Sequence, residues 1–249
     1  MKLLEQLRIR PRPEIYYFNT RREFYPQLLA AKLEELIGQE LARGKEGVVF
    51  LCIGTDRSTG DSLGPLIGHK LKERGRRRRA AGSPYMETGA ASFFGSAYGD
   101  STNSANSANS TNSTNSVNST SSTNNARTGA LVYGTLERPV HAMNLEQYRA
   151  FVMKKFPRRV VVAVDASVGN LEHVGYVTLG KGSLKPGLGV SKDLCEVGDI
   201  FITGIVGGCT SFDPVMLQSV RLAMVMRMAD CICDSICLVE NFWDFPSVV

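Results

Sequence analysis

Apolar residues along this chain follow two alternating patterns: short continuous runs, and sets spaced three and four residues apart. The continuous runs VVFLCI and VVVAV are typical of strands that are covered on both faces. Continuous apolar runs predict strands over 48–53, 130–133, 160–164, 174–179 and 199–206. Helical spacing predicts helices over 26–41, 65–74, 145–156 and 213–236. The alternation of strands and helices predicts an α/β fold, a three-layer α/β/α domain with a mainly parallel sheet.

Residues 101–125 interrupt this pattern with a different composition. Of these 25 residues, 22 are Ser, Thr or Asn. Such a segment cannot bury enough apolar surface to offset the entropy of ordering it. With its Gly-, Ala- and Arg-rich flanks it predicts a disordered insertion over about 76–128. We therefore expect an N-terminal tail over 1–24 and one peptidase-like domain over 25–249 that contains this insertion.

The net charge of +5 arises largely from one basic run, residues 74–79. No aromatic side chains interleave with this run, so a solvated basic loop is favoured over a nucleic-acid site. The charged N-terminus lacks the apolar core of a signal peptide, and no apolar stretch approaches the ~18 residues of a membrane span. Cysteines within apolar segments suit a reducing compartment. These features predict a cytoplasmic protein without nucleic-acid or membrane partners.

The segment GTDRSTGDSLGP, residues 54–65, runs from a predicted strand to a predicted helix, as phosphate-binding loops do. It lacks the G-x-G-x-x-G pattern, and Asp61 occupies the place where a P-loop has lysine. A carboxylate at that place repels phosphate. Nucleotide binding is therefore disfavoured, although Arg57 leaves it open.

Asp61 and Asp165 both follow predicted strands, and ligands of open α/β sheets bind beyond the carboxyl ends of strands. Two neighbouring carboxyls cannot both ionise easily, so one keeps its proton while the other acts as a base. Such a pair can hydrolyse an amide. The structural alternative is that Asp61 caps the following helix and Asp165 bonds a turn. Because Pro65 suits the first helical position, Gly64 is the better candidate for the cap.

Further candidates surround this pair. Asp56 shares the loop, His141 precedes the predicted helix 145–156, and the glycine- and lysine-rich segment 180–192 suits a loop over a substrate. A structural role for His141 is the more common case. The helix 145–156 is expected to start with Asn144 as its cap and Gln147 in a capping box.

Four longer strings then match a known pattern: VVFLCIGTDRSTGDSLGPLIGHKL, YGTLERPVHAMNL, VVVAVDASVG and KPGLGVSKDLCEVGDIFITGIVGG. Over residues 25–75 and 130–235 the chain resembles the YyaC-type sporulation proteins, which are labelled as spore proteases. That family in turn resembles the spore germination protease and the hydrogenase maturation proteases, which share a phosphorylase-like α/β/α fold. The resemblance implies this fold and a place in the forespore or spore.

The resemblance also assigns roles to residues. The positions that match the two aspartates considered catalytic in the germination protease are Asp61, in TGDSLGP, and Asp165, in VDA. Hydrogenase maturation proteases use these places, with a histidine, to recognise nickel, but residues 189–204 contain no histidine. We therefore expect no metal and no cofactor. Residues expected to bind the substrate are Gly54, Thr55, Asp56, Arg57, His141 and Lys185.

The expected function is a sporulation-associated endopeptidase that hydrolyses a protein or peptide substrate through this aspartate pair. Two alternatives stay open. The same crevice could bind a partner peptide without cleaving it, or the protein could be a metal-dependent protease of the maturation type.

Overall fold

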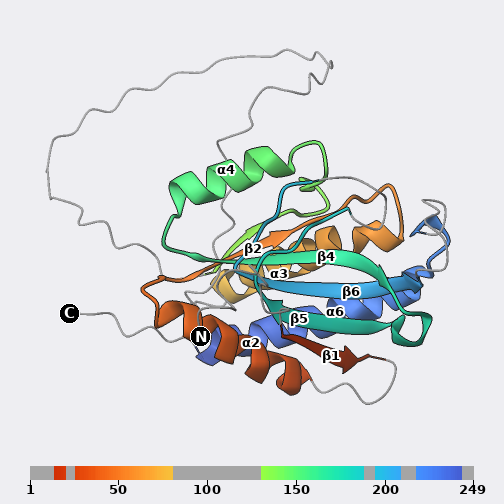
Figure 1. The fold of residues 1–249 in the computed structure, drawn as a ribbon, viewed down its shortest axis with the longest axis horizontal. Coiled ribbons are helices and arrows are strands. Elements are labelled where there is room, and N and C mark those ends of the chain that lie inside the picture. Colours follow the sequence, from red (N-terminus) through yellow and green to blue (C-terminus); the bar gives the residue numbers. More distant parts are fainter. Residues whose placement is uncertain (1–13, 21–25, 81–129, 188–193, 209–216, 243–249) are drawn as a thin grey trace, which may run out of the picture. The chain divides into compact units, whose positions relative to one another are not determined.

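The computed structural model describes residues 14–20, 26–80, 130–187, 194–208 and 217–242, all of which belong to one compact unit (Figure 1). The predicted insertion lies outside the described residues from residue 81 onward. The described part of the chain is an α/β fold with a six-stranded sheet and four α-helices. No described helix is long and apolar enough to span a membrane.

The sheet is mixed, with the strand order β1-β5-β6-β4-β2-β3. Strands β3, β2, β4 and β6 are parallel to one another, whereas β5 pairs antiparallel with β6, and β1 pairs antiparallel with β5. The strands are β1 (Ile15–Asn19), β2 (Val48–Cys52), β3 (Leu131–Tyr133), β4 (Val160–Gly169), β5 (Tyr176–Lys181) and β6 (Ile200–Gly208). All five predicted strands are present, with shifted ends.

Strand β1 lies within the segment that we expected to be an N-terminal tail. Its sequence IYYFN only weakly indicates a strand, because Ile15 and Tyr17 remain 41% and 51% exposed at the sheet edge. A strand at an edge buries too little surface to show a clear apolar pattern. It is the antiparallel pairing with β5, distant in sequence, that fixes it.

The four helices are α2 (Pro26–Leu41), α3 (Leu63–Ala80), α4 (Leu145–Lys155) and α6 (Leu222–Phe242). Helix α3 continues six residues past the predicted end at Arg74, so the basic run forms its last turns rather than a loop. Cations near a helix C-terminus interact favourably with the helix dipole. Helix α6 begins later than predicted, and residues 213–216 of that prediction lie outside the described residues.

The two faces of the sheet bury different hydrophobic clusters. Along β2, Val48, Phe50 and Cys52 join one cluster, and Val49 and Leu51 join the other. This is the period of two that a strand imposes. The first cluster contains the apolar sides of α2, α3 and α6, and the second contains that of α4. Both faces of the sheet are therefore covered by apolar side chains, which explains the continuous apolar runs of the central strands.

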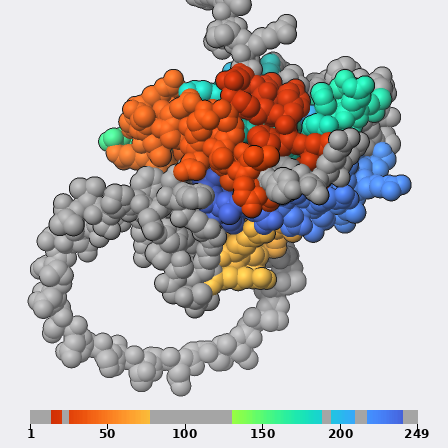
Figure 2. Space-filling view, turned by 90° about the horizontal axis from the view of Figure 1, so that it is seen from below, coloured from red at the N-terminus to blue at the C-terminus, as the bar shows by residue number. Residues whose placement is uncertain are grey.

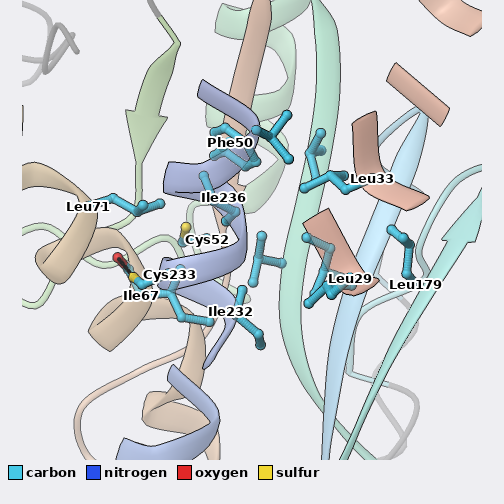
Figure 3. Close-up of a cluster of buried hydrophobic side chains, with 14 of the residues drawn as sticks. Leu29, Leu33, Phe50, Cys52, Ile67, Leu71, Leu179, Ile232, Cys233 and Ile236 are labelled. Carbon is cyan, nitrogen blue, oxygen red and sulfur yellow. Dashed lines mark hydrogen bonds between the residues drawn. The ribbon is translucent and has the colours of Figure 1, made fainter. Parts of the chain in front are cut away.

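The first cluster is the larger core. Figure 3 shows side chains from α2, α3 and α6 meeting those of the strands, with Cys52 and Cys233 among them. These two thiols are fully buried, as the interpretation of cysteine as a small apolar residue predicted. Figure 2 views the molecule from the side of these helices, where α2, α6 and the end of α3 lie side by side.

Candidate functional site

Asp165 lies inside β4 rather than beyond its end. We expected the strand to stop at Val164, but β4 continues to Gly169 because β6 pairs with it that far. On the other side, β2 ends at Cys52. Directly after β2, the Ile53 amide donates a hydrogen bond to the Val164 carbonyl of β4, at 2.7 Å. Asp165 is therefore the first residue of β4 beyond the last residue that pairs with β2.

Residues 54–61, called here the 54–61 loop, leave β2 at this point and fold back on themselves. Gly54 begins the loop with a φ of +139°, which residues other than glycine rarely adopt. A Cβ atom on Gly54 would also collide with the Asp61 carbonyl oxygen. That oxygen accepts a hydrogen bond from the Thr55 amide at 3.1 Å. The loop thus closes on its own ends and brings Asp61 back to the end of β2.

A 3-10 turn, Gly60–Ser62, carries Asp61 and leads directly into α3. Within the turn, the Ser62 hydroxyl donates to the Thr59 carbonyl at 2.7 Å. Gly64 is not the helix cap that the sequence suggested. It lies in the first turn of α3, where a Cβ atom would collide with the Ile53 carbonyl oxygen. The missing side chain of Gly64 thus allows the backbone of α3 to pack directly against the backbone at the end of β2.

The Asp165 carboxyl is buried, with 6% of the residue exposed. Burial, and secondly the charge of Asp61, raise its pKa well above the ordinary value of an aspartate. The Ala166 amide opposes this by donating a hydrogen bond to Asp165 Oδ1 at 2.8 Å. The structure therefore places the two predicted aspartates close enough to interact electrostatically, and Asp165 is the one whose pKa is raised.

His141 reaches the same region through a short parallel bridge. Ile53 pairs with Val140, and the Gly54 amide donates to the Val140 carbonyl at 2.8 Å. His141 follows directly, and its Nδ1 accepts the Met143 amide at 3.2 Å. In the neutral ring this leaves the proton on Nε2. His141 is half-buried beside the start of the 54–61 loop.

The predicted cap and capping box of α4 do not form. Asn144 precedes the helix, but its side chain makes no cap hydrogen bond. Its Oδ1 instead accepts the His141 amide at 2.8 Å, and its Nδ2 donates to the Pro139 carbonyl at 3.1 Å. Asn144 therefore fixes the turn that carries His141, which is a different use of the same hydrogen-bonding groups.

The other predicted substrate-binding residues divide into two places. Asp56 and Arg57 are exposed on the 54–61 loop, where the Thr55 hydroxyl accepts the Arg57 amide at 3.3 Å. Lys185 follows Leu184, which bridges to Val197 ahead of the start of β6. That is the opposite end of the parallel strands, so the described structure does not bring Lys185 to the aspartates.

Three hydroxyl residues beside Asp165 were missed by sequence reasoning. Thr203 on β6 is the register partner of Asp165, Thr178 on β5 is the partner of Thr203, and Ser167 follows Asp165 by two residues. Side chains in these positions share one face of the sheet. The sequence carried no signal for them, because threonine is also a good strand former.

A separate cavity of about 400 Å³ lies between α4 and the segments that enter β4 and β6. Its wall includes Val152, Phe156, Arg159, Val161, Val197 and Asp199. These strand residues precede Asp165 and Thr203, so this cavity is not the place where the aspartates meet. Among the described residues, no three His, Cys, Asp or Glu side chains are grouped as a metal site would require.

The fold and site define an α/β protein with a buried aspartate coupled to a second aspartate on a glycine-rich loop. The family model of DUF1256, described as "Protein of unknown function", matches residues 23–80 and 118–235. The chain is also 35% identical over 214 residues to a Bacillus subtilis (strain 168) protein described as "Uncharacterized protein YyaC". That match covers 85% of this chain and 79% of the relative. The chain belongs to this DUF1256 family, of the YyaC type that its motifs indicated.

Proposed function

We propose that this protein is an endopeptidase of sporulating cells that hydrolyses a protein substrate with Asp61 and Asp165. The observation that carries the proposal is the interaction of the two carboxyls: burial, and secondly the charge of Asp61, raise the pKa of Asp165. One ionised and one protonated carboxyl are what general acid–base hydrolysis of an amide needs.

In the proposed reaction, ionised Asp61 takes a proton from a water molecule, whose oxygen attacks the scissile carbonyl carbon. Asp165 gives its proton to the carbonyl oxygen, which produces a tetrahedral diol. Asp61 then passes its proton to the amide nitrogen, and Asp165 takes a proton back from a diol hydroxyl as the carbon–nitrogen bond breaks. Both carboxyls return to their starting states.

We assign the fold to the three-layer α/β/α type of phosphorylase-like hydrolases, and we place the protein in the forespore or spore. Supporting the fold assignment, the apolar sides of α2, α3 and α6 share one cluster with the sheet, while α4 shares the other. The 54–61 loop and His141 would line the crevice for the substrate.

The test is cleavage of small spore proteins by the purified full-length chain, followed by electrophoresis and mass spectrometry. Asp61→Asn and Asp165→Asn should each lower the cleavage rate by at least ~100-fold, since each removes an acid–base group. Glu172→Gln is the matched control, because Glu172 is an exposed acid in the turn after β4 and lies outside the proposed machinery. This variant should cleave at the wild-type rate.

Full cleavage by both aspartate variants would overturn the proposal. Binding of the spore proteins without cleavage would instead support a peptide-binding protein that uses the same crevice. Loss of wild-type cleavage in chelator, restored by one added metal, would support the metal-dependent alternative.

A further inference from the structure

The cavity between α4 and the segments that enter β4 and β6, called here the α4 cavity, has a volume of about 400 Å³. Among the described helices, α4 is the one whose side chains join the cluster on this face of the sheet, whereas those of α2, α3 and α6 join the other cluster. The single helix leaves a hollow at the start of the two strands. Its volume lies within the ~300–1,000 Å³ range of small-molecule sites.

Apolar side chains form much of the wall of the α4 cavity. Leu51 of β2 and Val152 of α4 are almost completely buried, and Val197 is 5% exposed. Phe156, directly after α4, adds an aromatic ring to the wall, and Met153 is a more exposed member of it. A hollow of this kind is stabilised when the apolar part of a ligand replaces the water in it.

Two guanidinium groups, those of Arg149 and Arg159, also line the cavity. The guanidinium carbon of Arg159 lies 5.6 Å from the centre of the Phe156 ring, and Arg159 Nη1 donates to the Val48 carbonyl at 3.3 Å. These contacts hold Arg159 beside the aromatic part of the wall. Arg149 extends from α4 and pairs with the exposed Glu146 at 3.2 Å. Ion pairs exposed to solvent are weak, so the anionic group of a ligand can compete with Glu146.

The two acidic groups of the wall, Asp199 and Glu196, already have partners. Lys45 Nζ lies 3.2 Å from Asp199 Oδ2, which also accepts the Val161 amide at 2.9 Å. Glu196 Oε2 accepts the Ser183 hydroxyl at 2.8 Å. Three cationic and two anionic side chains give the wall a net charge of +1. This charge is complementary to a ligand with one negative charge, rather than to the roughly two charges of a phosphate monoester at neutral pH.

We propose that the α4 cavity binds a small organic carboxylate, with its charged group on Arg149 and Arg159 and its apolar body against the buried side chains and the Phe156 ring. Guanidinium N–H groups match the two oxygens of a carboxylate in geometry and charge. The segment 180–192, in which the sequence suggested a loop over a substrate, contributes Ser183 to this wall. The site lies at the opposite end of the parallel strands from Asp165, so the proposal does not rest on peptidase activity.

The experiment is isothermal titration calorimetry of the full-length chain with three probes that share one apolar body. At neutral pH 2-naphthoate carries one negative charge, 2-naphthamide carries none, and 2-naphthyl phosphate carries about two. One molecule of 2-naphthoate should bind per chain with a Kd below ~1 mM, and the amide should bind at least ~10-fold more weakly. The phosphate should also bind more weakly than 2-naphthoate. Absence of saturable 2-naphthoate binding below ~1 mM, or tighter binding of either other probe, would overturn the proposal.

Substitutions then test the position of the site. Arg149→Gln and Arg159→Gln should each weaken 2-naphthoate binding by at least ~10-fold, since each removes a charge-assisted hydrogen bond. Arg158→Gln is the matched control, because Arg158 pairs with Glu46 at 2.6 Å and is not part of the cavity wall. It should bind 2-naphthoate like the wild type.

Equal weakening in all three arginine variants would show general attraction to a basic surface and would overturn the proposal, as would wild-type affinity in both Arg149→Gln and Arg159→Gln. Circular dichroism checks that each variant is folded. If Arg159→Gln does not fold, Arg149→Gln, a change on the outer part of α4, decides the outcome together with the Arg158→Gln control.

Discussion

At the scale of single residues, Asp165 is a group that destabilises the fold at neutral pH. Burial and Asp61 both oppose its ionisation, and the Ala166 amide compensates in part. Because its pKa is higher in the folded chain than in the unfolded chain, the folded state binds more protons between those two pKa values. The free energy of unfolding therefore falls as pH rises above about 4, and it levels off above the folded pKa.

Asp165→Asn should accordingly stabilise the chain, and more so at pH 8 than at pH 4. Asparagine cannot ionise, and its side-chain oxygen can still accept the Ala166 amide. Thermal unfolding by circular dichroism measures the effect, since ~1 kcal/mol corresponds to about 2–4 °C in Tm for a domain of this size. A stabilisation of the same size at both pH values would contradict a raised pKa of Asp165 in the folded chain.

At the scale of elements, α3 is held against the sheet by contacts between backbones. Gly68 faces Gly134, whose φ of +85° carries the chain away from β3. A Cβ atom on Gly68 would collide with the Gly134 carbonyl oxygen. This close approach sets the position of α3, and therefore of the 3-10 turn that carries Asp61.

Gly68→Ala should destabilise the chain by about 2 kcal/mol or more, because the added methyl group has no space to occupy. Gly38→Ala is the matched control, since Gly38 also lies inside a helix, α2, but meets nothing within 4 Å. It should stabilise the chain by about 0.5–1 kcal/mol through helix propensity. Urea unfolding of both variants gives the comparison, and equal effects of the two substitutions would argue against the close approach.

At the scale of the whole described unit, the sheet separates two cores. Leu33 of α2 belongs to the cluster shared with α3 and α6, and Val152 of α4 belongs to the cluster on the other face. Since a sheet and the layer packed on it are about 10 Å apart, side chains on opposite faces do not share contacts. Each cluster should therefore respond to substitution independently of the other.

Leu33→Ala and Val152→Ala should each destabilise the chain by about 2–4 kcal/mol, and the double variant should show the sum within ~0.5 kcal/mol. Chemical denaturation of the wild type, the two single variants and the double variant measures the coupling between them. A coupling free energy above ~1 kcal/mol would show that the two clusters act as one.

The sequence by itself determined the elements whose apolar pattern is local: the central strands, the helix over 26–41, and the dry faces of the sheet. It also placed Asp61 and Asp165 shortly after predicted strands, although Asp165 lies inside β4. A continuous apolar run such as VVVAV predicts a buried strand by itself, without knowledge of the segments that pair with it.

Only the tertiary structure decided the features that depend on pairing between distant segments. Strand β1 forms because it pairs with β5, and β4 extends to Gly169 because it pairs with β6 up to that residue. The return of the 54–61 loop, and the place of Thr203 beside Asp165, follow from backbone contacts and register that no local pattern encodes. The two aspartates could be proposed from the sequence, but their coupling arises because β4 is buried and longer than β2.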